Sequence, residues 1–352
     1  MSEATMHQIV LAARPHGRPS INDFRFEETA MPVMLPGGVL LRVLYLSLDP
    51  YMRGRMDDMK SYAKPVSLGE AMPGRGIAEV IASGHPAYAV GDTVVAQTGW
   101  RTHAAVTGEG LRKLDPALAP ITTALGVLGM PGFTAYAGLT LIGKPRCGET
   151  VAVAAASGPV GSLVGQLAKI TGCRTVGIAG GADKCRYVRD ELGFDAAIDH
   201  REHCFPEQLK RACPDGIDVY FENVGGAVWQ AVLPLLNQFA RVPVCGLIAQ
   251  YNGPGDSEEA HRLAPTMREV LTKSLTMRGF ISADFVEEHY PQFLRVVSAA
   301  VAKGRVRSRE DITDGVENAP QAFMGMLEGR NFGKVPVRVA SDAGTLSTRN
   351  GA

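Results

Sequence analysis

Apolar residues in the first third of the chain form short clusters that are separated by glycine and proline turns. The clusters lie at His7–Ala12, Val39–Leu48, Gly76–Ala82 and Thr93–Gln97. Short apolar or alternating runs bounded by such turns are typical of β-strands. Because no long helical period interrupts them, we expect a compact, barrel-like β domain in this part of the chain.

From Val151 to about Gly304 the pattern changes, because short apolar runs alternate with segments of helical period. This alternation is typical of a doubly wound parallel sheet. The predicted strands are Val151–Ala156, Arg174–Ala179, Ala196–Asp199, Gly216–Glu222, Ala240–Leu247 and Leu275–Ile281. The predicted helices are Ser162–Thr171, Asp183–Leu192, Phe205–Cys213, Ala227–Leu236 and Pro265–Thr272. Before them, Gly129–Gly132 is expected to break the chain and Phe133–Leu141 to form a crossover helix.

The pattern after residue 290 predicts two more helices and one more strand. Helices are expected at Pro291–Ala302 and Asn318–Glu328, and a final strand at Lys334–Val339 that rejoins the first domain. The polar residues after it are expected to fray. The chain is therefore predicted to be an α/β protein with a doubly wound sheet and a separate β domain.

A glycine-rich turn follows the first strand of the alternating part. Residues 156–161 fit G-x-G-x-x-G with alanine in the first position. Gly158 lets a pyrophosphate approach the backbone, and Gly161 lets the next helix pack close to the strand. Pro159 suits a first helical turn, whose free N–H groups face an anion. The turn predicts a dinucleotide site, and the alternative is a structural turn without a ligand.

The tip of the next strand indicates which dinucleotide is bound. An NAD site places Asp or Glu about 20 residues after the first glycine, to hold the ribose 2′-hydroxyl. Here the tip is Gly180-Gly181, which leaves room for a 2′-phosphate, and Lys184 can pair with that phosphate. Arg186 is a second candidate, and Asp183 is a counter-signal that lies beyond the tip. We expect NADPH rather than NADH, and the alternative for Lys184 is a solvated helix lysine.

An unusual loop runs from Asp49 to Met56 and on to Tyr62. It is rich in tyrosine, methionine and arginine. Methionine and aromatic side chains form adaptable apolar walls, and a tyrosine hydroxyl can donate to a developing oxyanion. The alternative is a packed loop in which Tyr51 and Met52 belong to the core.

Polar or special residues also follow three strands of the alternating part. They are Asn223, the run from Cys245-Gly246 to Tyr251, and Phe280. Each alone has a plain interpretation as a turn. Together they line the carboxyl edge of one sheet, which is where such sheets bind ligands.

Composition and charge narrow the function classes. The chain has 352 residues and equal numbers of basic and acidic residues, 36 each, which argues against a dedicated nucleic-acid or anionic-membrane binder. No apolar run approaches the ~20 residues of a membrane span, and residues 1–10 lack the features of a signal peptide. None of the six cysteines precedes Cys147 or forms C-x-x-C, so free thiols in the cytoplasm are expected.

The quoted motifs resemble the zinc-independent branch of the medium-chain dehydrogenase/reductase family, and more closely its leukotriene/prostaglandin reductases and double-bond (curcumin-type) reductases. The similarity covers nearly the whole chain. Its motifs are Asp49–Met56, Gly129–Tyr136, Ala155–Ser162, Glu222–Gly226, Tyr251-Asn252 and Gly329–Lys334. The resemblance implies a GroES-like domain at 1–127 and 306–342, a Rossmann domain at 128–305 and a tail at 343–352. It also implies a cleft between the two domains and a homodimer, to which Leu275–Ile281 is suited as an edge strand.

The resemblance implies NADPH-dependent reduction of the C=C bond of an α,β-unsaturated ketone or aldehyde. Lys184 would bind the 2′-phosphate, and Asn223, Cys245, Tyr251, Phe280 and Asn331 would contact the ribose and nicotinamide ends of the cofactor. The other implied cofactor positions are Pro50, Met130, Thr134, Gly158, Pro159, Val160, Gly161, Gly180, His200, Gly246 and Ile248.

In this chemistry a hydride moves to the substrate β-carbon and negative charge builds on the carbonyl oxygen. The candidate donors to that oxygen are Tyr251, Tyr62 and Tyr51, in that order, since a phenol stays protonated at neutral pH. The α-carbon can take its proton from water.

Two positions depart from the family pattern. His200 stands where the family often has tyrosine, and a protonated histidine would pair with the phosphate and make NADPH affinity depend on pH. The segment Pro73–Gly76 is less glycine-rich than expected, because it contains Arg75.

The sequence can also be compared with the requirements of other functions. A zinc alcohol dehydrogenase needs Cys and His ligands in the first domain, which contains no cysteine, and the only His/Cys cluster is His200-x-x-His203-Cys204. We therefore expect no metal. A quinone reductase of the same branch, or a non-catalytic NADPH-binding redox sensor or crystallin-like protein, is the remaining alternative.

Overall fold

The computed structural model describes residues 5–253 and 263–340. Their chain folds into two compact units, residues 5–125 with 310–340, and residues 126–309. The sequence analysis predicts the domain boundaries two residues later, at 127/128, and four residues earlier, at 305/306. The tail expected at 343–352 lies outside the described residues.

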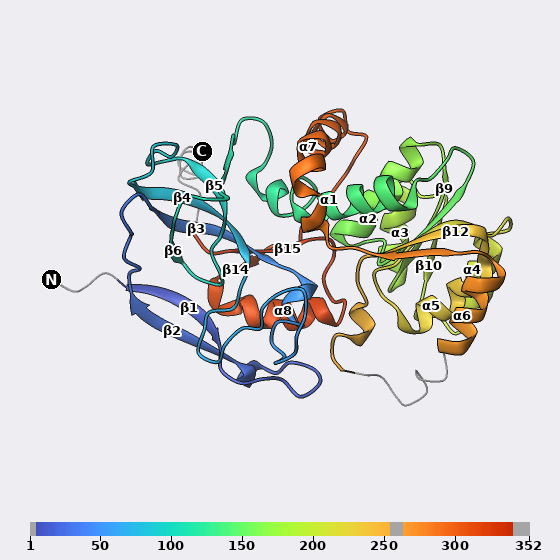
Figure 1. Cartoon of the computed structure of the whole chain (residues 1–352), viewed down its shortest axis with the longest axis horizontal. Helices are drawn as coiled ribbons and strands as arrows, with labels where there is room; N and C mark the ends of the chain where they lie inside the picture. Colours follow the sequence, from blue (N-terminus) through green and yellow to red (C-terminus); the bar gives the residue numbers. More distant parts are fainter. Residues whose placement is uncertain (1–4, 254–262, 341–352) are drawn as a thin grey trace, which may run out of the picture. The chain divides into compact units, whose positions relative to one another are not determined.

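The strands of the first unit pair antiparallel, except that β14 pairs parallel with β15. Its main sheet has the order β14-β15-β3-β4-β5-β7, with β6 added on β3, while β1 pairs with β2 in a separate two-stranded sheet. The bounds are β1 Thr5–Leu11, β2 Phe24–Ala30, β3 Val39–Leu48, β4 Arg75–Ser83, β5 Thr93–Gln97, β6 His103–Val106, β7 Arg112–Leu114, β14 Thr313–Asp314, β15 Val335–Arg338, and helix α8 Ala319–Leu327. Figure 1 draws the N-terminal strands beside the red C-terminal elements.

The final strand does rejoin the first domain, as predicted. In β15, Val335 pairs antiparallel with Leu48 of β3. Helix α8 brings Phe323 against Trp100, with ring centroids 5.5 Å apart, and Phe24 stacks on the same indole. These rings are buried in the unit's core, so residues from both ends of the chain build one hydrophobic core.

The second unit is a parallel sheet with the strand order β10-β9-β8-β11-β12-β13. This is the doubly wound order 3-2-1-4-5-6, so the predicted Rossmann fold is confirmed. The strands are β8 Thr150–Ala154, β9 Arg174–Ala179, β10 Ala196–Asp199, β11 Ile217–Phe221, β12 Leu236–Val244 and β13 Thr276–Gly279. The helices are α1 Met130–Ala137, α2 Pro159–Ile170, α3 Ala182–Arg186, α4 Phe205–Ala212, α5 Gly226–Val232, α6 Leu263–Thr272 and α7 Val286–Ala302.

The helices of this unit cover both faces of the sheet. Figure 1 draws α2 and α3 on one side and α4, α5 and α6 on the other. Such a sheet is buried on both faces, which explains why every residue of β8 is buried.

Several element ends differ from the prediction. Helix α1 begins at Met130, so Gly129–Gly132 does not break the chain. Gly129 caps the helix, Pro131 is accommodated in its first turn, and a Cβ on Gly132 would lie 2.0 Å from the carbonyl oxygen of Val127. The chain then continues as the π-helical segment Gly138–Gly143. The glycine motif here permits close packing rather than a break.

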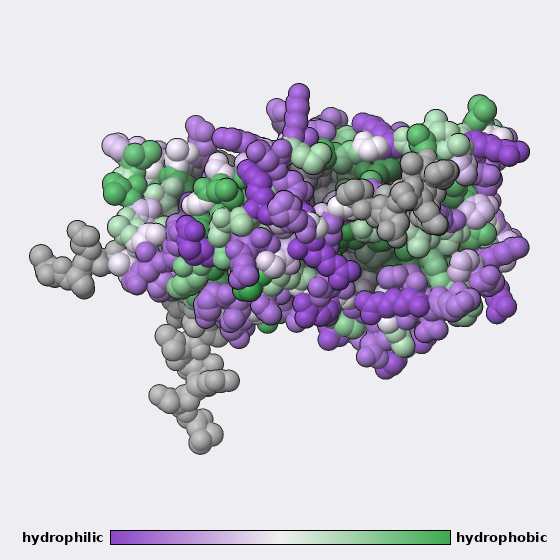
Figure 2. Space-filling view, turned by 90° about the horizontal axis from the view of Figure 1, so that it is seen from below, coloured by the Kyte–Doolittle hydropathy of each residue, from purple (hydrophilic) through white to green (hydrophobic). Residues whose placement is uncertain are grey.

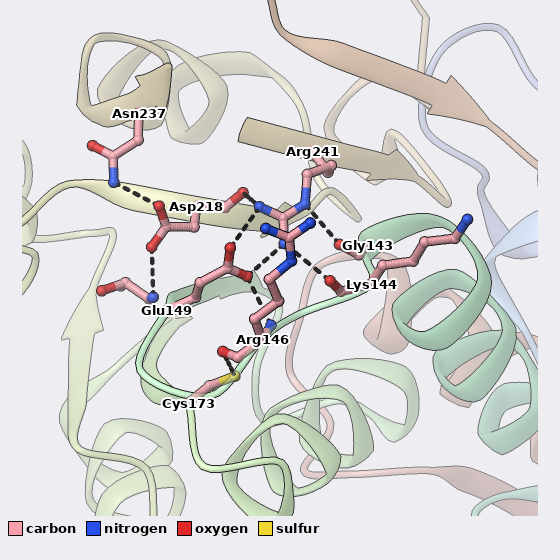
Figure 3. Close-up of polar contacts among 9 residues, drawn as sticks. Gly143, Lys144, Arg146, Glu149, Cys173, Asp218, Asn237 and Arg241 are labelled. Atoms are coloured by element: carbon pink, nitrogen blue, oxygen red, sulfur yellow. Dashed lines mark hydrogen bonds and ion pairs between the residues drawn. The ribbon is translucent and has the colours of Figure 1, made fainter. Parts of the chain in front are cut away.

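A network of charges holds the amino end of the parallel sheet (Figure 3). The Arg241 guanidinium donates to both oxygens of Glu149, at 3.1 and 2.5 Å, and to the carbonyl oxygens of Gly143 and Lys144. Asp218 accepts from the backbone N–H of Thr150 at 2.8 Å. These contacts join β12, β11 and the turn before β8 at the edge opposite the strand carboxyl ends.

The surface in Figure 2 mixes hydrophilic and hydrophobic residues across the face it presents. Within residues 5–253 and 263–340, no helix combines the length and hydrophobicity that a membrane crossing requires.

Candidate active site

The glycine turn after β8 has the close packing predicted for it. Ala155 adopts φ 51°, a left-handed conformation, and its carbonyl oxygen accepts from the Gly158 N–H at 2.9 Å. A Cβ on Gly161 would lie 2.4 Å from that same oxygen, so only glycine allows α2 to start here. Gly158 is the N-cap of α2 and Pro159 lies in its first turn, where the free N–H groups and the positive end of the helix dipole are found. The turn has the form of an anion cradle.

The tip of β9 gathers positive charge. A Cβ on Gly180 would lie 2.9 Å from His200 Nε2 and 2.9 Å from Arg201 Nε. Lys184, half-buried on α3, is close enough for its charge to act on His200. Asp199 is also near this tip, but its carboxylate accepts from the backbone N–H groups of Gly181 and Arg201. The three basic side chains near Gly180 suit a 2′-phosphate.

His200 is neutral more readily than an ordinary histidine. Partial desolvation of its ring and the adjacent Arg201 guanidinium lower its pKa, although the residue stays accessible to solvent. The second predicted cation, Arg186, is instead paired with Asp183 at 2.8 Å. Thus Lys184 remains the primary candidate, and Arg201 is a residue that the sequence analysis missed.

A buried carboxylate organises the turn after β11. Glu222 Oε1 accepts from the Val224 N–H at 2.7 Å, the Gly225 N–H at 2.9 Å and the Tyr220 hydroxyl at 3.1 Å. Burial raises the pKa of Glu222, and the two backbone donors oppose the rise. The Asn223 side chain donates to the Ala154 carbonyl oxygen at 2.8 Å. The predicted residue Asn223 is thereby fixed against the end of β8.

The segment after β12 is attached to this turn. The backbone N–H of Cys245 donates to Glu222, and that of Ile248 donates to Asn223. Burial raises the pKa of the Cys245 thiol to about 12, so it is a neutral wall rather than a nucleophile. A Cβ on Gly246 would lie 3.0 Å from the Tyr251 hydroxyl, which places that phenol over the glycine. The carboxyl ends of β8, β11 and β12 are therefore joined.

Three further predicted residues lie within the same unit. Phe280 follows β13, is buried, and packs edge-to-face on Phe221 at 6.2 Å. Met130 accepts from the Ser282 hydroxyl through its sulfur at 2.9 Å. Thr134 donates to the Met130 carbonyl oxygen at 2.8 Å, so its hydroxyl is used within α1.

The other predicted residues belong to the first unit. Pro50 and Tyr51 form the short helix Pro50–Met52, and Tyr62 is 64% exposed. Burial and the Asp49 carboxylate raise the pKa of Tyr51, so its phenol remains a proton donor. The side chain of Asn331 donates to the Gly333 carbonyl oxygen at 2.7 Å.

A buried ion pair supports the Tyr51 loop. Lys334 Nζ donates to Asp49 Oδ1 at 2.5 Å and to the Leu48 carbonyl oxygen at 2.7 Å, and Lys334 is only 3% exposed. Ser47 donates to the other Asp49 oxygen. The loop is thus attached to β3 and to the start of β15, while Met52 and Met56 fill the core beneath it.

Metal ligation has no support in the described part of the chain, where no group of three or more His, Cys, Asp and Glu side chains is arranged to hold an ion. The residues present fit an NADPH instead. The glycine cradle suits a pyrophosphate, the basic group at Gly180 suits a 2′-phosphate, and the ordered loops after β11 and β12 suit the rest of a dinucleotide.

Comparisons with known proteins show which family the chain resembles. Residues 7–114 match the family described as the N-terminal domain of oxidoreductase, and residues 159–299 match zinc-binding dehydrogenase. The NADPH-dependent curcumin reductase of Escherichia coli is 51% identical over 95% of this chain and 96% of its own length. The 2-alkenal reductase (NADP(+)-dependent) of Nicotiana tabacum is 40% identical over 97% and 99%. The crystal structure of CurA in complex with NADPH from Vibrio vulnificus matches with a TM-score of 0.93 and 49% identity, over 96% of this chain and 100% of that one.

Proposed function

The chain belongs to the zinc-independent medium-chain dehydrogenase/reductases, and from that premise we propose that it reduces the C=C bond of α,β-unsaturated ketones and aldehydes with NADPH. The main structural support for NADPH as the cofactor is the group of basic side chains around Gly180, namely Lys184, His200 and Arg201. The reaction is supported by the relatives named for curcumin and 2-alkenals.

Three groups of residues at the Rossmann sheet edge would each bind a different part of NADPH. The turn at Gly158 and Gly161 would hold the pyrophosphate, and Lys184, His200 and Arg201 the 2′-phosphate. The loops anchored by Glu222 would hold the ribose and nicotinamide ends. The bound cofactor supplies the hydride.

A tyrosine is proposed to stabilise the enolate oxygen that forms when the substrate β-carbon is reduced. Tyr251 is the first candidate because its hydroxyl lies over Gly246, at the edge where the Rossmann loops meet. Tyr62 and Tyr51 follow it. Each phenol can donate without giving up its proton, and water can supply the proton of the α-carbon.

For Tyr251→Phe we expect kcat to fall by about two orders of magnitude, the typical loss of an oxyanion donor. The Kd of NADPH, measured by fluorescence titration, is expected to stay within about twofold. An unchanged kcat would remove Tyr251 from the mechanism and transfer the role to Tyr62 or Tyr51, each tested as the phenylalanine variant.

The first experiment is NADPH oxidation at 340 nm with an unsaturated ketone, an alkenal, a quinone and a saturated aldehyde, with NADH in parallel. We expect turnover of the enone and the alkenal with NADPH, and a saturated carbonyl as product. Turnover of the quinone alone would indicate a quinone reductase. Binding of NADPH without any turnover would indicate a redox sensor.

The enzyme is further proposed to act as a homodimer in the cytoplasm. Strand β13 is an edge of the Rossmann sheet, and all four of its residues are exposed, so its backbone is available for pairing with a second copy. The six free cysteines support a reducing compartment.

A further inference from the structure

Two cysteines that the proposed reaction does not use lie on neighbouring segments at the amino end of the Rossmann sheet. Cys147 is exposed in the turn before β8, and Cys173, which is only 3% exposed, comes directly before β9. Strands β8 and β9 are paired. The backbone joins the two segments as well, because the Gly148 N–H donates to the Gly172 carbonyl oxygen at 3.0 Å. The two thiols therefore belong to adjoining parts of one edge.

Two reciprocal contacts bring the cysteines together. Cys173 Sγ donates to the carbonyl oxygen of Arg146, the residue just before Cys147, at 3.2 Å. Figure 3 draws this hydrogen bond next to the Arg241 network. Conversely, a Cβ on Gly172, the residue just before Cys173, would lie 2.8 Å from Cys147 Sγ. Each sulfur thus lies against the residue that precedes the other cysteine.

The backbone of both segments favours this arrangement. The Arg146 carbonyl oxygen also accepts from the Glu149 N–H at 3.1 Å, so a tight turn folds Cys147 back toward the start of β9. Gly172 has φ 85° and no side chain, which leaves the space that the Cys147 sulfur fills. Neighbouring strands lie about 4.8 Å apart, and a disulfide spans Cα atoms about 4.4–6.8 Å apart. A bond between the two sulfurs would therefore join segments that are already adjacent.

The two thiols differ in their access to solvent. Cys147 is exposed, so an oxidant in solution can reach it. Burial raises the pKa of the Cys173 thiol to about 11, so this thiol is rarely ionised and is a poor target for the same oxidant. An exposed cysteine beside a buried one is the arrangement in which the first is oxidised and the second then bonds to it.

We propose that Cys147 and Cys173 form a reversible oxidation site for hydrogen peroxide. The Cys147 thiolate attacks one peroxide oxygen, the O–O bond breaks, hydroxide leaves, and Cys147 becomes a sulfenic acid. The Cys173 sulfur then attacks the Cys147 sulfur and the S–O bond breaks. The hydroxide that leaves takes the Cys173 proton and becomes water. One peroxide is reduced by two electrons, and the two thiols are oxidised to one disulfide.

The disulfide protects Cys147 from further oxidation. A sulfenic acid without a neighbouring thiol proceeds to sulfinic acid, which thiol reductants do not reverse. The bond also closes a covalent loop over residues 147–173, which contain β8, the Gly158 turn and α2. Because the pair lies at the edge opposite the proposed cofactor turns, its oxidation does not depend on the reductase function.

The test treats the reduced enzyme with a small molar excess of hydrogen peroxide, unfolds it in N-ethylmaleimide and digests it with trypsin. Cleavage after Arg146, Lys169 and Arg174 separates the two cysteines into the peptides 147–169 and 170–174. We expect mass spectrometry to find most of these two peptides joined by a disulfide. Dithiothreitol should restore both free thiols.

Cys173→Ser keeps a hydroxyl donor for the Arg146 carbonyl oxygen but cannot form the disulfide. In this variant dimedone should trap Cys147 as a sulfenic acid, and longer exposure should give a sulfinic acid that dithiothreitol does not restore. Cys204→Ser is the matched control, because it removes another exposed thiol of the same unit. It should leave the yield of joined peptides at the wild-type value. Melting temperatures verify that each variant is folded.

The opposite results are equally clear. The proposal is wrong if peroxide leaves both thiols free, or if wild-type Cys147 passes to sulfinic acid while Cys173 can still be alkylated. It is also wrong if Cys147 is joined to a second copy of the chain instead of to Cys173. Loss of the joined peptides in Cys204→Ser would show that a different thiol forms the bond.

Discussion

At the scale of single residues, the proposed preference for NADPH rests on the side chains that surround Gly180. A side chain at this position would collide with His200 and Arg201, so the glycine allows these two basic side chains to lie at the proposed phosphate site. Arg186 is equally basic but is paired with Asp183 on the same short helix. The proposed phosphate ligands were therefore chosen by where each basic side chain lies, and not by its charge alone.

Lys184→Ala and Arg201→Ala are each expected to raise the Kd of NADPH by about tenfold, the value of one charge-assisted contact to phosphate. The Kd of NADH should change little, because NADH lacks the phosphate. Arg186→Ala is the matched control and should behave as wild type. Equal losses in Lys184→Ala and Arg186→Ala, measured by fluorescence titration, would refute the assignment.

His200 should make NADPH affinity depend on pH. Its pKa is lowered in the free protein, first by desolvation and then by Arg201, and a bound phosphate would raise it. A group whose pKa rises on binding strengthens binding as pH falls. NADPH should therefore bind more tightly toward about pH 5.5 than at pH 8, and His200→Tyr should flatten this dependence. A flat profile in wild type would exclude the role.

At the scale of elements, the two ends of the Rossmann sheet have different tasks. The carboxyl end carries the glycine cradle and the anchored loops, whereas the amino end is held by Arg241, Glu149 and Asp218 (Figure 3). Burial raises the pKa of Glu149, but the hydrogen bonds from Arg241 and the Arg146 N–H outweigh it, and the net pKa is lowered. A carboxylate of this kind stabilises the fold only while it is ionised.

Glu149→Gln is expected to lower the free energy of unfolding at pH 7 by about 1–3 kcal/mol, since Arg241 loses its charged partner. The difference from wild type should shrink as pH falls below about 4.3, where the unfolded carboxyl takes up its proton. Urea denaturation at several pH values measures both. Glu207→Gln, at an exposed position on α4, should cost little at any pH. A constant difference down to pH 3 would contradict the linkage.

The sequence predicted most of the Rossmann elements, because glycine turns mark their ends. The bounds of β9, β10 and β5 agree with the prediction. Strand β2 was not foreseen, since Phe24–Ala30 is mostly exposed and polar and has no apolar run. The position of Arg201 near Gly180 was also not predicted. It depends on a turn in which its N–H donates to Asp199 at 3.0 Å, and spacing along the chain does not reveal that contact.

At the scale of the whole molecule, self-association is proposed through the exposed edge β13. Met277 is 40% exposed on this strand, so Met277→Lys should place a charge in the interface and shift the protein toward monomer. Light scattering across a concentration series measures the change. Leu118→Lys, at a position 82% exposed in the first unit, is the control and should not alter the mass. A dimer that is indifferent to Met277→Lys would place the interface elsewhere.

The pairing of β15 with β3 has a consequence for the order of events during synthesis. Leu48 meets Val335 only after the ribosome has synthesised all the residues between them, and the same holds for Asp49 and Lys334. Until then β3 can pair with β4 and β6 but lacks β15, and Asp49 lacks its cation. Residues 126–309, by contrast, are contiguous. Because domains fold as units during translation, we expect the nucleotide-binding unit to fold on the nascent chain. Residues 5–125 can complete their own unit only after residues 310–340 have been synthesised.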